Sequence, residues 1–106
     1  MGPGKIASQA GHAFLGSYLQ TLKQNPDAAG LYLADGIGTK VCLAIPNLEW
    51  LLLVRDLLLQ KDIPFVLIED SGHKHFFNGK PTITALGVGP AKREEIHKII
   101  GRFKLL

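Results

Sequence analysis

Residues 47–70 read NLEWLLLVRDLLLQKDIPFVLIED and join two kinds of segment. Residues 48–60 are rich in leucine, and Asn47 before them is a residue type that helix N-caps prefer. Residues 63–70 form a short apolar run that ends on two acidic side chains, a pattern typical of a strand covered on both faces. This stretch therefore predicts a helix that leads directly into a buried strand.

The helix expected at residues 48–60 has more apolar surface than one sheet can cover. On a helical wheel, Glu49, Asp56 and Gln60 form a narrow polar wedge, and apolar residues fill most of the rest. A helix that rests on one side of a sheet needs an apolar stripe of only about 100°. The second apolar flank therefore meets either another helix of this chain or another subunit.

Shorter segments of both kinds precede this stretch. Residues 5–24 show helical spacing of apolar and small residues, and Pro26 ends that run. A short second helix is expected next, with Pro26 near its start and Gly36 beyond its end. Residues 39–46, TKVCLAIP, are apolar without polar alternation and predict a strand covered on both faces. The recurring residues of the first helix are Ile6, Ala10, Ala13, Phe14, Ser17 and Leu22.

The C-terminal part continues the alternation of strands and helices. Residues 82–89, TITALGVG, predict a strand, and Pro90 is expected in the first turn of a final helix that Gly101 ends. Residues 102–106 are expected to add a short extended tail. This order predicts an α/β fold, a three-layer sandwich with a small mixed β-sheet flanked by helices, in one domain over residues 1–106. The inward-facing residues of the final helix are Ile96, Ile99 and Ile100.

Composition narrows the class of protein. The chain has 106 residues, of which 46% are hydrophobic and 20% charged, as in ordinary folded domains. No apolar run reaches the roughly 18 residues that a membrane span needs, and the N-terminus lacks the pattern of a signal peptide. Cys42 is the single cysteine, so an internal disulfide is excluded and a cytoplasmic location is expected.

The net charge of +3 is compatible with a polyanionic partner but does not require one. Basic side chains gather in the last fifteen residues, where they form either a solvated helix face or a surface for nucleic acid. We call this group the basic cluster, and its members are Lys92, Arg93, Lys98, Arg102 and Lys104.

The start of the chain has the features of an anion site. Gly2 and Gly4 leave the backbone bare before a helix whose first N–H groups are unpaired, and Lys5 adds a positive charge. A nucleoside-triphosphate loop needs Ser or Thr after its Gly-Lys pair, and Ile6 stands there instead. Around Gly87 and its neighbours, a proline likewise interrupts any dinucleotide fingerprint.

Several other polar residues are candidates for chemistry. Asp70 ends a buried strand, where a carboxylate either faces a ligand crevice or caps the following turn. His73 and His75 form an H-x-H pair, but no further ligand completes a metal site, so no metal or cofactor is expected. His12 is expected on the inner side of the first helix, and His97 on the exposed side of the last.

Four sequence blocks resemble the second family of peptidyl-tRNA hydrolases, the type widespread in archaea and eukaryotes. Their order and spacing follow that family along the whole chain, and the first block is the most specific. The blocks are GKIASQAGHA at residues 4–13, VLIEDSG at 66–72, TALGVGP at 84–90 and GRFKLL at 101–106.

The resemblance implies an α/β enzyme, often dimeric, that hydrolyses the ester joining a peptide to tRNA. Carried over by position, the reactive lysine is Lys5, the reactive aspartate is Asp70, and the threonine of the third strand is Thr84, with Thr82 as the alternative. Peptidyl-tRNA is then the partner, and a homodimer is an option. The residues expected to bind substrate are Gly4, Gln9, His12 and Lys74.

Family members carry an apolar strand before the glycine-lysine turn, whereas this sequence starts on the turn. We therefore expect the chain either to be marginally stable alone or to fill the gap with a partner strand or a rearranged tail. Two other functions stay open. One is a relative that binds tRNA or another RNA without cleaving it, and the other is an interaction module that uses the leucine-rich helix at residues 48–59.

Overall fold

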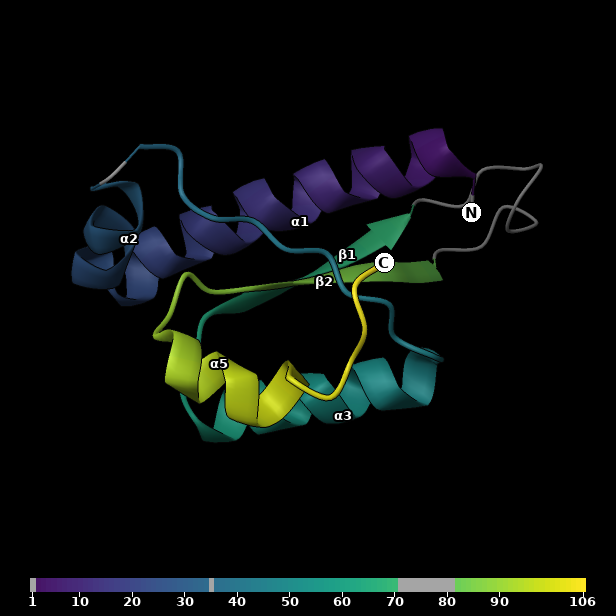
Figure 1. Cartoon of the computed structure of the whole chain (residues 1–106). Coiled ribbons are helices and arrows are strands. Elements are labelled where there is room, and N and C mark those ends of the chain that lie inside the picture. The colour runs from purple at the N-terminus through teal and green to yellow at the C-terminus, as the bar shows by residue number, and fades with distance from the viewer. Residues whose placement is uncertain (1, 35, 71–81) are drawn as a thin grey trace.

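The computed structural model describes residues 2–34, 36–70 and 82–106, without the side chains of residues 70 and 82. Its elements form three layers, with α1 over one face of a small sheet and α3 and α5 over the other (Figure 1). This arrangement confirms the α/β class. The elements are α1 (Pro3–Gln24), α2 (Pro26–Leu33), α3 (Leu48–Gln60), β1 (Phe65–Asp70), β2 (Thr82–Val88) and α5 (Arg93–Ile100).

The sheet of the described residues consists of β1 and β2, which pair antiparallel from Phe65 opposite Val88 to Asp70 opposite Thr82. A mixed sheet was expected, but no parallel pair occurs within the described ranges. The register shifts after Ile68, so that β2 carries one extra residue at this point. Such a bulge bends a strand and increases its twist.

The apolar core lies between the sheet and the α3–α5 layer. Leu58 and Val54 of α3 are fully or nearly fully buried there, together with Ile99 of α5. Leu53 and Leu59 of the same helix α3 stay exposed. Within the part of the chain that the structure describes, the second apolar flank of α3 is therefore only partly covered.

The other face of the sheet receives α1 through small and polar side chains. A Cβ atom built on Gly87 of β2 would lie 2.9 Å from the carbonyl carbon of Ala13, so the helix backbone almost touches the strand. Because the helix and the strand are so close, large side chains do not fit between these layers. Leu22 was expected among the residues that recur at helical spacing, but its side chain is exposed. The buried residues of α1 are Gln9, Ala13, Ser17 and Thr21.

The structure differs from the sequence prediction at residues 39–46 and at the start of α5. Residues 39–46, all of which are described, form a single bridge from Leu43 to Leu105 and not the expected strand. Within the described residues, no strand pairs with this segment along its length. The same bridge confirms the extended C-terminal tail. Helix α5 begins at Arg93, so Pro90 precedes the helix and does not occupy its first turn.

Candidate active site

A groove of about 640 Å³ runs between α1 and β1. Three predicted site residues, Lys5, Gln9 and His12, lie along its wall on α1. On the strand side, Ile68 and Glu69 come from the end of β1. The groove therefore brings together the start of the first helix and the end of the first strand, which are separated by more than fifty residues in sequence. The remaining lining residues are Ser8, Leu15, Gly16, Leu19 and Leu67.

The geometry of α1 explains why its groove residues share one face. Residues spaced by three, four and seven positions follow one another along a helix surface, and Lys5, Ser8, His12, Leu15 and Leu19 have this spacing. The wall is therefore one continuous ridge of the helix.

The three predicted residues on α1 differ in burial. Gln9 is 5% exposed, Lys5 is half-buried and His12 is exposed. The expectation of an inward-facing His12 was therefore wrong. Its position lies about 100° around the helix from Ala13, which occupies the buried face. His12 borders the groove from the solvent side, where it is accessible to a ligand.

The N-terminus of α1 opens at the same end of the groove. Gly2 is the N-cap and offers no side-chain hydrogen bond, and its carbonyl accepts from the backbone N–H of Ile6 at 3.0 Å. The first turn has no acidic residue, and a Cβ on Gly4 would meet no heavy atom of the described residues within 4 Å. The first N–H groups of a 22-residue helix carry partial positive charge. Together with Lys5, this end attracts anions.

The strand β1 runs antiparallel to α1, so its last residue lies toward the start of the helix (Figure 1). Gly16 faces Val66 early in the strand, whereas Glu69 lines the groove near its end. Asp70 is the last residue of β1, with its backbone opposite Thr82. The predicted residue Lys74, and the histidine pair beside it, lie outside the described residues.

Thr84 takes a different position from the other predicted residues. It is the extra residue of the bulge, because Ile68 pairs with Ala85 and Glu69 pairs with Ile83. Its hydroxyl donates to the carbonyl oxygen of Ile68 at 3.3 Å, and it does not line the groove. Bulges are frequent next to active sites, where they redirect a side chain. The catalytic role of Thr84 stays a prediction.

Several residues of the groove were not predicted from the sequence. Ser8 extends the polar wall, and Glu69 adds a carboxylate beside the position of Asp70. Leu15 and Leu19 continue the wall away from Lys5. The helical spacing from Lys5 onward was the signal that could have identified the residues on α1. No comparable signal distinguished Glu69 from an ordinary strand-end acid.

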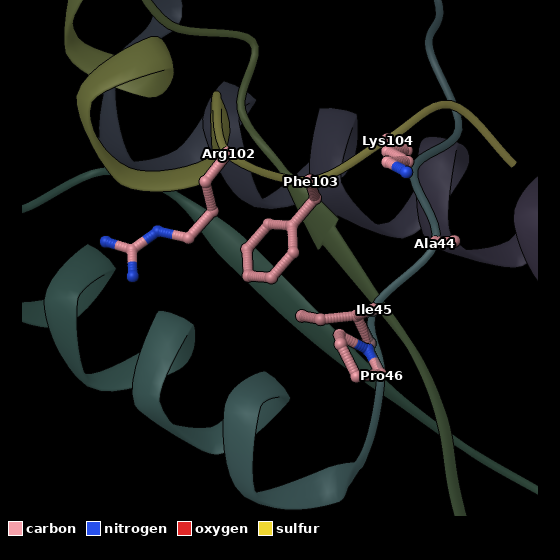
Figure 2. Close-up of a pocket in the computed structure, with 6 residues that line it drawn as sticks. All are labelled: Ala44, Ile45, Pro46, Arg102, Phe103 and Lys104. Atoms are coloured by element: carbon pink, nitrogen blue, oxygen red, sulfur yellow. The ribbon is translucent and has the colours of Figure 1, made fainter.

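A second cavity of about 340 Å³ lies where the C-terminal tail crosses residues 44–46. Figure 2 shows the Phe103 ring pointing toward Ile45 and Pro46. The guanidinium of Arg102 lies 5.3 Å from the centre of the Trp50 ring. None of the residues lining this cavity is acidic, so it offers no general base for hydrolysis. The groove at α1 is the better candidate for chemistry.

Within residues 2–34, 36–70 and 82–106, no group of three or more His, Cys, Asp or Glu side chains could hold a metal ion. In the same ranges, no helix combines the length and apolar character that crossing a membrane requires.

The fold and the groove define a class of protein: an α/β protein with an anion-attracting site between a helix N-terminus and a strand end. The family described as "Peptidyl-tRNA hydrolase PTH2" matches residues 1–106. The chain belongs to this family of enzymes, which hydrolyse the ester bond of peptidyl-tRNA and release peptide and free tRNA.

Relatives from three archaea support this membership. A peptidyl-tRNA hydrolase of Methanothermobacter thermautotrophicus is 39% identical over 106 residues, which are 100% of this chain and 89% of the relative. That of Methanocaldococcus jannaschii is 35% identical over 106 residues, covering 100% of this chain and 90% of the relative. The peptidyl-tRNA hydrolase of Methanopyrus kandleri is 35% identical over 103 residues, which are 97% of this chain and 85% of the relative.

Proposed function

We propose that the chain hydrolyses peptidyl-tRNA in the groove between α1 and β1, with Lys5 and Asp70 as its main catalytic residues. One observation carries the assignment: the groove holds Lys5, Gln9 and His12 beside the last residues of β1. Ile68 and Glu69 line the groove, and Asp70 follows them as the last residue of β1. This position in the chain supports a role for Asp70 at the same end of the groove.

The proposed reaction needs no covalent intermediate on the protein. The carboxylate of Asp70 accepts a proton from a water molecule, directly or through a neighbour, as the water oxygen attacks the ester carbonyl. Lys5 and the N–H groups at the start of α1 stabilise the negative charge on the carbonyl oxygen. The tetrahedral intermediate then expels the ribose oxygen, which takes up the proton that Asp70 accepted from the water, and Thr84 assists by hydrogen bonding.

Substrate binding is assigned to the residues around this centre. Gly4 leaves room for a phosphate or the ribose near the helix N-terminus, and Gln9 and His12 offer hydrogen bonds along the wall. We include Lys74 and the basic cluster as contacts to the tRNA backbone, which hold the substrate without reading its sequence.

The location and assembly of the enzyme belong to the same proposal. A hydrolase of peptidyl-tRNA acts where translation supplies its substrate, and a lone cysteine fits the reducing cytoplasm. A homodimer would cover the exposed flank of α3, where Leu53 and Leu59 reach solvent.

Ester cleavage tests the assignment. The substrate is an N-acetylaminoacyl-tRNA, and the readout is the rate at which free tRNA appears. We expect Lys5→Met to lower kcat about 10²- to 10³-fold, because it removes a charge that stabilises the oxyanion. Asp70→Asn should lower kcat at least as much. The matched control is Lys23→Met, an exposed lysine in the last turn of the same helix, which should leave the rate unchanged.

The alternatives give different results in this assay. If the wild-type protein binds the tRNA without cleaving it, the chain is a non-catalytic relative. If it neither binds nor cleaves tRNA, but self-associates as its concentration rises, it is an interaction module. Full activity in folded Lys5→Met and Asp70→Asn would show that the chemistry uses other residues.

A further inference from the structure

The groove between α1 and β1 has two chemically different ends. The end near the start of α1 holds Lys5, Gln9 and His12. Farther along the same helix face, the wall changes to Leu15 and Leu19. Both ends belong to one continuous cavity of about 640 Å³, so one ligand can occupy them together.

The two leucines are unusual for residues that line a cavity. Leu15 is 60% exposed and Leu19 is 48% exposed, although they lie one turn apart on the same face. Single exposed leucines need no explanation, but adjacent ones inside a groove form an apolar surface that a ligand can cover.

The reaction identifies which part of the substrate can reach this surface. The ester has two sides, the tRNA and the peptide, and the cationic start of α1 favours the polyanionic tRNA. The peptide then extends along α1 toward Leu15 and Leu19. An apolar side chain on the peptide matches these leucines, whereas a nucleotide does not.

The length of the helix between the two ends sets the register. With 1.5 Å of rise per residue, Leu15 lies roughly 15 Å from Lys5 along the helix axis, and Leu19 roughly 21 Å. An extended peptide advances about 3.3 Å per residue. The leucines are therefore opposite the peptide residues about four to six positions before the ester.

We propose that Leu15 and Leu19 form a subsite for an apolar side chain of the nascent peptide, about four to six residues upstream of the ester. This inference rests on the proposed function, because the polar end of the groove must hold the ester. The subsite gives the enzyme a preference for longer peptidyl-tRNAs with an apolar residue in this window.

Three substrates built on the same tRNA test the proposal. The first carries only N-acetylglycine, and the others carry N-acetylated heptapeptides that differ by leucine or serine at the fifth residue before the ester. The wild-type enzyme should show a KM about tenfold lower for the leucine peptide than for the serine peptide. The acetylglycyl substrate is too short to reach the subsite and serves as the baseline.

Variants of the leucines complete the test. Leu15→Ser and Leu19→Ser should remove the difference between the two heptapeptides and leave kcat and KM for acetylglycyl-tRNA unchanged. The matched control is Leu22→Ser on the same helix, where the leucine is 41% exposed and does not line the groove. This control should keep the preference for leucine.

Three results would overturn the subsite. They are equal KM values for both heptapeptides in the wild-type enzyme, a preference that survives in Leu15→Ser and Leu19→Ser, and a loss of acetylglycyl-tRNA cleavage in these variants. Failure of the proposed function looks different, because folded Lys5→Met would then cleave all three substrates at the wild-type rate.

Discussion

Gly87 determines how closely α1 approaches the sheet. A Cβ at this position would lie 2.9 Å from the carbonyl carbon of Ala13 and closer still to its oxygen. Both are backbone atoms, so they cannot rotate away as a flexible side chain would. The wall of the groove depends on this approach, since Gln9 and Ala13 lie one turn apart on the buried face of α1.

Gly87→Ala should therefore push α1 away from β2. We expect the free energy of unfolding to fall by about 1–3 kcal/mol, the usual cost of overpacking, as measured by urea denaturation. The control is Gly11→Ala on the open side of α1, where a Cβ meets no heavy atom within 4 Å. That change should raise stability by about 0.5–1 kcal/mol through helix propensity. Equal stability of Gly87→Ala and the wild type would contradict the close approach.

Among single residues, the sequence identified those whose motif is local. Lys5, Gln9 and His12 came from one short block and do line the groove. The burial of Gln9 could not be predicted in this way, because a polar side chain on a helix is usually exposed. Glu69 lines the groove only because α1 packs beside the end of β1, and no local sequence pattern predicts that contact.

Asn47 fixes the start of α3. Its side-chain oxygen accepts a hydrogen bond from the backbone N–H of Trp50 at 2.9 Å, which satisfies one of the unpaired donors of the first turn. The sequence predicted this cap from residue type alone. An N-cap depends only on a few neighbouring residues, and for that reason it can be predicted from the sequence.

Replacing this cap should destabilise the protein without touching the groove. We expect Asn47→Ala to lower the free energy of unfolding by about 1 kcal/mol, while kcat and KM stay at their wild-type values. Asn47→Ser keeps an oxygen that can cap the helix and should recover most of the loss. A stability of Asn47→Ala equal to that of the wild type would show that the cap is unimportant here.

Elements that need a distant partner were harder to predict. The helices α1, α2 and α3 and the strands β1 and β2 match expected segments, because their periodicity and boundary residues are local. Residues 39–46 have the composition of a strand, yet they pair only at Leu43. A strand exists only where a neighbour offers its backbone groups, so composition alone does not make one.

At the scale of the whole molecule, the two faces of the sheet have different roles. The face toward α3 and α5 carries the apolar core around Leu58, and the face toward α1 carries the groove (Figure 1). Stability and activity are therefore separable by substitution.

Two adjacent leucines of α3 test this separation. Leu58 is completely buried, so Leu58→Ala should lower the free energy of unfolding by about 2–5 kcal/mol. Leu59 is 61% exposed, and Leu59→Ala should change it by less than about 0.5 kcal/mol. Thermal or urea unfolding gives both values. Similar losses in the two variants would contradict the position of the core.

Charge acts over the whole surface. The basic cluster is exposed and lies on α5, directly before it and in the C-terminal tail, whereas the proposed ester site lies at the start of α1. Raising the salt concentration from about 50 to 200 mM should increase KM about tenfold through two phosphate contacts and leave kcat unchanged. An aminoacyl ester of a single nucleoside lacks the tRNA backbone and should show little change in KM. A salt-independent KM for tRNA would exclude these contacts.

By itself, the sequence determined the α/β class, the main helices and the residues of the glycine-lysine block, because periodicity, caps and short motifs act over a few neighbouring positions. Only the tertiary structure decided that α1 lies against β1, which joins Lys5 to the end of the strand and extends the groove to Leu15 and Leu19. The physical reason is the close approach at Gly87. Any glycine in a strand permits another backbone to come close, and only the tertiary structure shows that α1 approaches Gly87 at Ala13.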